Sequence, residues 1–441
     1  MKHTPLWIGI LALWLVASAG GVWLALATDA PRASSKALEV SSLDEAARTE
    51  SEPLEHQERH VVLPMDVEID VQPDIAPAKT ADSQPEDAEA ADKRQTKTNE
   101  IASSRDDTVA SEGKTAIPER RQIHNVEVRN GGTVQLPSGE VSIDGDLTIA
   151  EGGQLSAAGT TIVLDGENQT ISGTATAGKI IMRGGTKRIS GTFGTQSTAN
   201  ADPGKAQLYV EAGTTLIIEK GGKWNTPNPY GFQIAGDLVI DGGEFNCRFS
   251  NGNGTDRGEE SWLPGSTLTI CSGKFIGNGD ADFSGATITI HDGALEINDD
   301  IWNSGDALNM YGGTMRNTTG GGMFYLSGNV NIRDGKLQVY QNYTRSLRFA
   351  KDSSVYCTGG EISINGSSAT SDDGGILLAS SATVPDLVIN ASTKIHKGSA
   401  TDAFLSVSGD LKIAKGQRFE GKGFKVIASY LQTQDQGEFV P

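Results

Sequence analysis

Short alternations of apolar and polar residues, each ended by a glycine, recur through the C-terminal three quarters of the chain. Six clear copies are GDLVIDGGEF (236–245), GSTLTICSGKF (265–275), GATITIHDGAL (285–295), GDALNMYGGTM (305–315), GNVNIRDGKL (328–337) and GDLKIAKGQRF (409–419). Apolar residues stand five and three positions before an anchor glycine, as Leu268 and Ile270 do before Gly273. Period-two alternation interrupted by glycine predicts a short strand, a bend and a second strand.

Weaker copies extend the pattern to eleven, with anchors also at Gly152, Gly185, Gly213, Gly360 and Ser392. The anchors are 20 to 33 residues apart, a range typical of solenoids, in which one coil buries its apolar face only against its neighbours. We therefore predict an all-β fold, a parallel β-helix of about eleven coils over residues 121–441, with the longer spacings as loops at one corner. A propeller would need about 40–50 residues per blade, and an antiparallel sandwich or barrel a strand every ~8–12 residues.

The first 120 residues have a different composition. An uncharged run of 22 residues, Leu6 to Ala27, follows Lys2 and is long enough to span a bilayer. It predicts a transmembrane anchor over residues 1–27 with its N-terminus in the cytoplasm, or a signal segment if Ala25–Ala27 is cleaved. Residues 28–120 contain no Phe, Trp or Tyr, one Gly, and 22 acidic against 11 basic residues, which predicts a disordered acidic linker.

Two stretches of the repeat region resemble bacterial exported β-helix proteins, namely the passenger domains of autotransporters and adhesins of the filamentous-haemagglutinin kind. These are GGTVQLPSGEVSIDGDLTIAEGGQLSA (131–157) and GDLKIAKGQRFEGKGFKVIASY (409–430). The resemblance is one of style over about three quarters of the chain, and it departs from autotransporters in that we do not expect the residues printed after Tyr430 to supply a C-terminal membrane barrel. It implies display outside the inner membrane, and adhesion or scaffolding. A weaker resemblance, to bactofilin-type filaments, rests on the membrane segment ahead of the solenoid.

The overall charge and the cysteine content narrow the classes of partner. With 37 basic and 56 acidic residues the formal net charge is −19, which argues against nucleic acid as a partner. The 3 cysteines include no CxxC or Cys/His group at zinc spacing. The repeat places Cys357 and Cys247 inward and Cys271 outward, and leaves a Cys247–Cys271 bridge open.

Acidic residues at one corner are the candidates for chemistry. Asp280 and Asp300 each lie seven residues after an anchor, and Asn278 and Asn298 each lie five after, so each pair should meet on adjacent coils. With Asp282 and Asp299, these carboxylates could bind Ca²⁺, or Asp280 and Asp300 could act as acid and nucleophile on a glycosidic bond. The alternative is a turn ladder of asparagines beside solvated aspartates.

Aromatic residues that interrupt the repeat are candidates for ligand binding, because exposed rings stack on sugars or anchor a protein partner. The candidates are Trp224, Tyr230, Phe232, Trp262, Trp302, Tyr340 and Tyr343. The alternative is that such rings fill the ends of a narrow core.

These observations predict a membrane-tethered, exported β-helix that serves as a structural or adhesive element of a bacterial envelope and binds glycan or an envelope protein. One alternative is a polysaccharide lyase or glycoside hydrolase that uses the acidic corner. Another is a self-assembling scaffold, since an uncovered β-helix end exposes an edge. Against the latter, the charged stretch 120–124 and the polar stretch 432–437 predict covered ends. No cofactor other than calcium is indicated.

Overall fold

The computed structural model describes residues 108–110, 113–116, 122–196, 206–228, 231–249, 261–318, 322–342, 346–369, 374–397 and 402–441. All regular structure in these residues is β, and none of it is a helix long and apolar enough to cross a bilayer. The anchor predicted over 1–27 and the linker up to residue 107 lie outside the described residues. The first two strands, β1 (Thr108–Ala110) and β2 (Gly113–Ala116), fall within the stretch that composition assigned to the linker.

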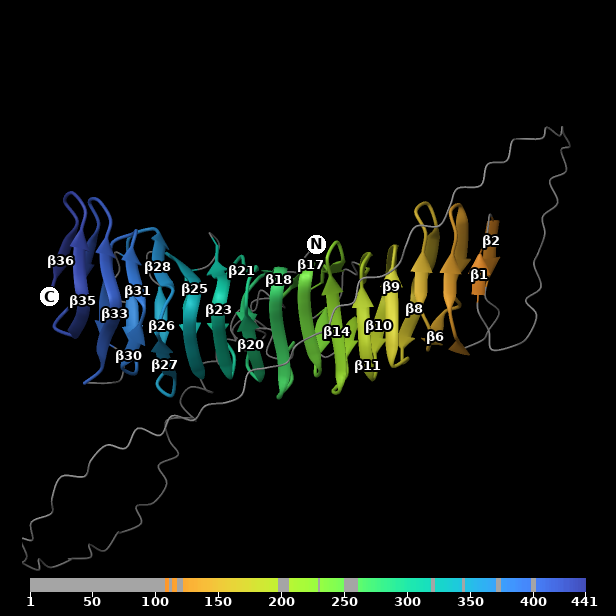
Figure 1. Cartoon of the computed structure of the whole chain (residues 1–441), viewed down its shortest axis with the longest axis horizontal. Helices are drawn as coiled ribbons and strands as arrows, with labels where there is room; N and C mark the ends of the chain where they lie inside the picture. Colours follow the sequence, from red (N-terminus) through yellow and green to blue (C-terminus); the bar gives the residue numbers. More distant parts are fainter. Residues whose placement is uncertain are drawn as a thin grey trace, which may run out of the picture. The chain divides into compact units, whose positions relative to one another are not determined.

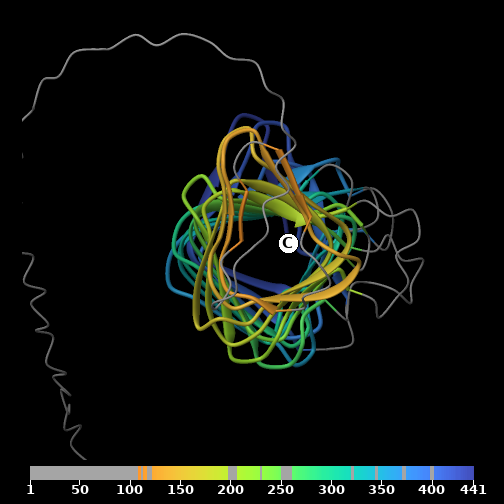
Figure 2. The ribbon, with the colours of Figure 1, turned by 90° about the vertical axis from the view of Figure 1, so that its right-hand side faces the viewer.

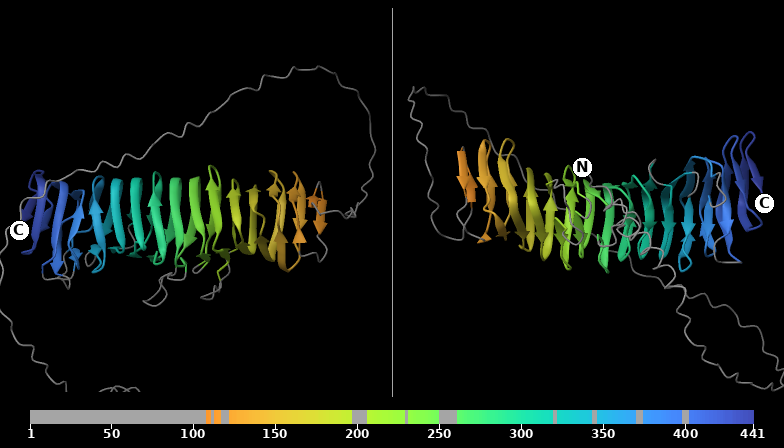
Figure 3. Two further views of the ribbon diagram at one scale, coloured as in Figure 1. Left: turned by 60° about the horizontal axis from the view of Figure 1, so that its bottom comes forward. Right: turned by 180° about the vertical axis from the view of Figure 1, so that it is seen from behind.

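The described chain forms a parallel β-solenoid of about 13 turns, so the predicted fold class is confirmed in its β-helical part. The coils stack along one axis, as the views from different sides show (Figures 1 and 3). Seen along that axis, the coils enclose a common interior (Figure 2). A typical coil has one strand segment on each of three faces, and each segment pairs in parallel with the equivalent segment of the next coil.

Each face is defined by the strands that form it. The first face contains β1 (Thr108–Ala110), β4 (Val126–Val128), β7 (Leu147–Ile149), β9 (Asn168–Ser172), β11 (Gly185–Ile189), β14 (Thr214–Glu219), β20 (Ala286–Ile290), β27 (Ser354–Cys357) and β30 (Ala382–Val384). The second face contains β2 (Gly113–Ala116), β5 (Gly132–Gln135), β12 (Thr192–Thr195), β15 (Lys223–Thr226), β21 (Ala294–Ile297), β28 (Glu361–Gly366) and β31 (Asp386–Ile389).

The third face contains β3 (Gln122–Ile123), β6 (Gly139–Ile143), β13 (Leu208–Val210), β16 (Phe232–Ile234), β19 (Ala281–Asp282), β22 (Ile301–Asn303), β24 (Phe324–Leu326), β26 (Leu347–Phe349), β29 (Ile376–Leu378), β32 (Thr393–Lys397), β34 (Arg418–Glu420) and β36 (Glu438–Val440). Long strands bend from the first face into the second: β17 (Asp237–Arg248), β18 (Ser266–Asn278), β23 (Ala307–Asn317), β25 (Asn329–Gln341), β33 (Phe404–Ile413) and β35 (Lys425–Thr433). Two others, β8 (Gln154–Leu164) and β10 (Thr174–Met182), bend from the second face into the third.

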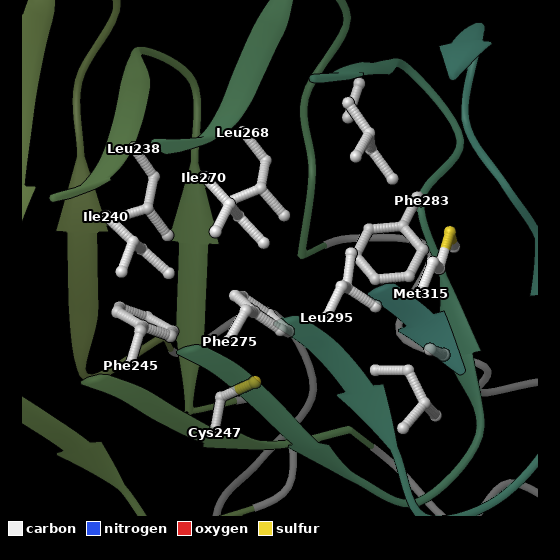
Figure 4. Packing of buried hydrophobic residues seen from close by; sticks show 14 of the residues in the cluster. Leu238, Ile240, Phe245, Cys247, Leu268, Ile270, Phe275, Phe283, Leu295 and Met315 are labelled. Carbon is white, nitrogen blue, oxygen red and sulfur yellow. The ribbon is translucent and has the colours of Figure 1, made fainter. Parts of the chain in front are cut away.

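The apolar positions of the repeat fill the interior, as predicted. In adjacent coils Leu238 pairs with Leu268, Ile240 with Ile270 and Phe245 with Phe275, and all of these side chains are fully buried. Figure 4 shows these side chains stacked coil upon coil, with Cys247 beside them. Like residues therefore stack at spacings of about 4.8 Å, and each coil supplies the apolar surface that its neighbour needs.

A column of glycines at the corner between the first and second faces explains why the repeat contains its anchor. Gly273 and Gly293 have φ angles of 85° and 81°, in the left-handed region that disfavours other residues. A Cβ on Gly293 would lie 2.4 Å from the carbonyl oxygen of Gly273, and one on Gly273 2.2 Å from that of Gly243. The backbone of the preceding coil thus occupies the space that a side chain would need.

The repeat gave too few coils because its anchors do not all lie at one corner. Gly185 and Gly213 separate third-face strands from first-face strands, whereas Ser392 and Gly416 separate the second face from the third. Counting anchors therefore skips some turns. Most of the longer links join the second face to the third, where the sequence predicted the insertions; they range from the short link between Ile297 and Ile301 to the stretch between Arg248 and Trp262. The link between Lys397 and Phe404, from the third face to the first, is an exception.

The predicted C-terminal cover is not formed. Gln432 and Thr433 belong to β35 and pair in parallel with Lys412 and Ile413, so the polar stretch 432–437 continues the last coil and does not close over it. Leu431 pairs with Leu411, yet its exposed fraction is 44%, against 1% for Leu411. At the other end, Gln122 and Ile123 form strand β3 and pair with β6.

Candidate functional site

The acidic corner lies where the second face passes into the third. Asp280 directly precedes β19 and Asp300 directly precedes β22, and Ala281 pairs with Ile301, so the two aspartates occupy equivalent positions on adjacent coils. The backbone N–H of Ala281 donates to the carbonyl of Asp300 at 2.9 Å, which holds the two coils together at this corner. Burial, followed by the negative charges of Asp299 and Asp300, raises the pKa of Asp280.

The carboxylate of Asp300 binds the backbone of the following coil. It is buried, and its Oδ1 accepts hydrogen bonds from the backbone N–H groups of Gly322 at 2.7 Å and Met323 at 2.9 Å. These contacts attach the coil of β22 to that of β24 at a turn where the ladder offers no partner. A carboxylate held by two amides is well suited to a structural role.

The carboxylates of Asp282 and Asp299, the other two candidate calcium ligands, also accept hydrogen bonds from nearby residues. Asp282 is buried, and its Oδ1 accepts from the backbone N–H of Ser284 at 2.8 Å and from its hydroxyl at 2.5 Å. Asp299 Oδ1 accepts from the backbone N–H of Asp300 at 3.0 Å. No group of three or more His, Cys, Asp or Glu side chains suited to a metal ion occurs in the described residues. The calcium site predicted at Asp280, Asp282, Asp299 and Asp300 therefore has no such group to support it.

Asparagines form the turn ladder that was the alternative for this corner. Asn298 Nδ2 donates to Asn278 Oδ1 at 2.6 Å, and Asn278 Nδ2 donates to the carbonyl of Cys247 at 3.2 Å. The backbone N–H of Gly279 donates to Asn298 Oδ1 at 2.8 Å. Side-chain amides thus bond coil to coil where the chain leaves the second face.

Beside this ladder lies a groove of about 500 Å³, which the sequence did not predict. Residues of four successive coils line it: Asn225, Thr226, Pro227, Asn246, Cys247, Arg248, Asn278, Gly279, Asn298 and Asp299. Asn225 pairs with Asn246 and Arg248 with Asn278, so the side chains that line the groove stand in two columns along the solenoid. The alignment of these side chains was the signal available in the sequence. Asn225, however, lies in the Pro/Asn-rich stretch KWNTPNPYGF (223–232), which interrupts the repeat and so gives no register.

Three of the seven candidate aromatic residues are core residues. Trp224, Phe232 and Trp262 are at most 2% exposed. The Trp224 ring stacks between those of Phe193 and Phe245, at centroid distances of 6.5 and 6.4 Å, and its indole N–H donates to Thr226 Oγ1 at 2.6 Å. This placement corrects the binding role proposed for the three rings, since none offers a face to a ligand. The alternative, that the rings fill a narrow core, describes them.

The remaining aromatic candidates that the structure describes do not form one exposed binding surface. Trp302 and Tyr340 are half-buried, and Trp302 lies in β22, two residues after Asp300 of the acidic corner. Tyr230 and Tyr343 lie outside the described residues. A different exposed stack was missed: His291 stacks on Tyr311 at 5.2 Å, and the Arg333 guanidinium lies 5.3 Å from the centre of the Tyr311 ring.

The cysteines have the orientations that the repeat predicted. Cys247 and Cys357 are buried and Cys271 is half-buried; all three are free, so no Cys247–Cys271 bridge exists. Burial raises the pKa of Cys357 to about 12, which makes it an unreactive core thiol.

Comparison with known proteins adds no relative from which a function could be carried over. No family model matches the chain, and neither a curated protein nor a solved structure matches it. The function must therefore be argued from the solenoid itself.

Proposed function

We propose that the chain is a membrane-tethered, exported β-solenoid that serves as a structural or adhesive element of a bacterial envelope. The observation that carries the proposal is the groove beside the asparagine ladder, which crosses four coils whose second-face strands pair without a break. A stack of parallel coils with a fully buried apolar interior holds the lining residues in fixed register over that length. Such a surface is suited to holding an extended partner.

The tether is the second part of the proposal. The apolar run Leu6 to Ala27 supports anchorage, and the acidic, aromatic-free stretch after it supports a spacer. A flexible chain of that length reaches about 50–60 Å on average, enough to hold the solenoid away from the bilayer surface.

Cell fractionation tests this arrangement with the full chain. We expect the protein in the membrane fraction, and we expect protease added to intact spheroplasts to release the solenoid by cutting ahead of residue 108. Retention of the released solenoid on isolated envelopes would support the adhesive role. A solenoid protected inside intact spheroplasts would refute export.

One observation favours a second candidate, a polysaccharide-degrading enzyme. The pKa of Asp280 is raised by burial and by two neighbouring carboxylates, as a general acid requires, and its neighbour Asp299 lines the groove. Incubation of the full chain with polysaccharides, scored for new chain ends, tests this role. New ends that disappear in Asp280→Asn, with unfolding unchanged, would establish the enzyme; their absence across the panel would reject it.

A further inference from the structure

We propose that the groove beside the asparagine ladder binds a neutral, extended glycan through Asn225, Asn246 and Arg248. The inference rests on the proposed function in that it names the ligand of the same corner. None of these three residues is among the aromatic rings that were first predicted to bind glycan.

Some polar atoms of the groove lining form hydrogen bonds within the protein, and others are free to bond to a ligand. The Asn278 and Asn298 amides bond to each other and to the backbone, and Asn246 Nδ2 donates to Glu244 Oε1 at 2.6 Å. Within the described residues, the Asn225 amide, Asn246 Oδ1 and the Arg248 guanidinium have no hydrogen-bond partner in the protein. These three groups, from neighbouring coils, supply both hydrogen-bond donors and an acceptor. The coils that carry them are already held in place by the asparagine ladder.

The chemistry of the lining favours sugar hydroxyls over other ligands. Arg248 and Asp299 contribute one charge of each sign, so neither a polyanion nor a polycation is favoured. The apolar lining residues are Pro227 and the buried Cys247, which leaves no pocket for the apolar anchors on which protein partners usually depend. Backbone groups of the lining strands are paired in the ladders, so a peptide cannot add to them as an extra strand.

The shape of the groove selects an extended ligand. Four coils at about 4.8 Å per step carry the lining along the solenoid axis, and about 500 Å³ lies within the range of ligand sites. Hydroxyl groups that repeat along a glycan chain can meet amides that repeat along the solenoid.

The test measures retention of the full chain on immobilised glycans. The neutral probes are dextran, mannan, laminarin and cellohexaose, and the anionic probes are alginate and chondroitin sulfate. We expect at least one neutral glycan to retain the wild type. The double variant Asn225→Ala/Arg248→Ala should weaken that retention about tenfold or more, because two hydrogen-bonding side chains are lost. Both residues are exposed, so little change in stability is expected.

A matched variant removes the same residue types elsewhere. Asn390→Ala/Arg188→Ala deletes one exposed asparagine and one exposed arginine that do not line the groove, and we expect retention within about twofold of the wild type. Retention by the anionic probes alone, equal losses in both double variants, or no retention by any neutral probe would each overturn the inference. None of these results would alter the outcome of fractionation, so the two proposals fail separately.

Discussion

One inward-facing position of the first face is polar in two coils and apolar in the coils that follow them. Gln169 and Lys187 pair in register on adjacent coils, and the same position continues as Leu216, Leu238 and Leu268. Both polar side chains are buried, and Lys187 is 0% exposed. The middle coils place leucine at this position, whereas the two coils of Gln169 and Lys187 place buried polar side chains there.

The difference follows the needs of the backbone. Gln169 Nε2 donates to the carbonyls of Ile143 at 2.8 Å and Gly145 at 2.6 Å, and its Oε1 accepts from the N–H of Gly166 at 2.9 Å. Lys187 Nζ donates to the carbonyl of Gly166. In these coils the turn between the third and first faces leaves backbone groups inside, and polar side chains satisfy them. An apolar interior is thus the default, and buried polar groups mark turns that cannot complete their own hydrogen bonds.

Removing an aromatic ring from the middle coils should have the largest effect. Phe275→Ala should lower the free energy of unfolding by about 3–5 kcal/mol, because Phe275 stacks on Phe245 at 5.4 Å and lies 6.1 Å from the rings of both Trp262 and Phe283. Guanidinium unfolding measures this cost. As a control, Tyr356→Ala at a 63% exposed ring should cost less than about 0.5 kcal/mol. Equal effects would contradict the described packing.

The buried lysine should make the stability depend on pH. Burial lowers the pKa of Lys187 to about 8, from about 10.4 in an unfolded chain. Below pH 8 the residue is protonated in both states, and the folded state bears the full cost of a buried ammonium. Between about pH 8 and 10.4 the unfolded chain binds more protons, so this residue makes the folded state more stable as pH rises, by about 3 kcal/mol in all.

Lys187→Met isolates this contribution, since methionine keeps the length of the side chain and removes the charge. The difference in unfolding free energy between wild type and variant should change by about 3 kcal/mol from pH 7 to 10.5. Other lysines and tyrosines titrate equally in both proteins and so cancel. A pH-independent difference would mean that Lys187 is not buried as described.

The sequence predicted the repeating part of the molecule better than its exceptions. Leu268, Ile270 and Gly273 are specified by local alternation and a backbone clash, both of which recur in the adjacent coils with anchors at Gly243 and Gly293. Trp224 and Trp262 were misjudged, because a ring in an insertion can turn inward where the insertion rejoins the ladder, and no local pattern records that. The groove depends on the register between Asn225 and Asn246, 21 positions apart across an irregular coil. Long-range register at irregular coils was the missing information.

At the acidic corner a buried polar group has the same task as Gln169 in the N-terminal coils. Asp300→Ala should cost about 2 kcal/mol, because the N–H groups of Gly322 and Met323 lose their acceptor. Asp300→Asn retains an acceptor oxygen at the same place and should cost less than about 1 kcal/mol. Hydrogen exchange at the two amides measures both variants. Equal protection in Asp300→Ala and the wild type would refute the structural role of this carboxylate.

A substitution in the last coil should have the smallest effect on stability, and it contrasts most with the same substitution one coil earlier. Leu411 and Leu431 hold the same interior position on adjacent coils, but the latter is 44% exposed. Leu411→Ala should therefore cost about 2–5 kcal/mol, and Leu431→Ala less than about 1 kcal/mol, since a half-exposed side chain loses less transfer free energy. Unfolding at two protein concentrations measures both variants. If Leu431→Ala proved as costly as Leu411→Ala, and the cost grew with concentration, the last coil would be covered in solution by a second copy of the chain, as the self-assembly hypothesis requires.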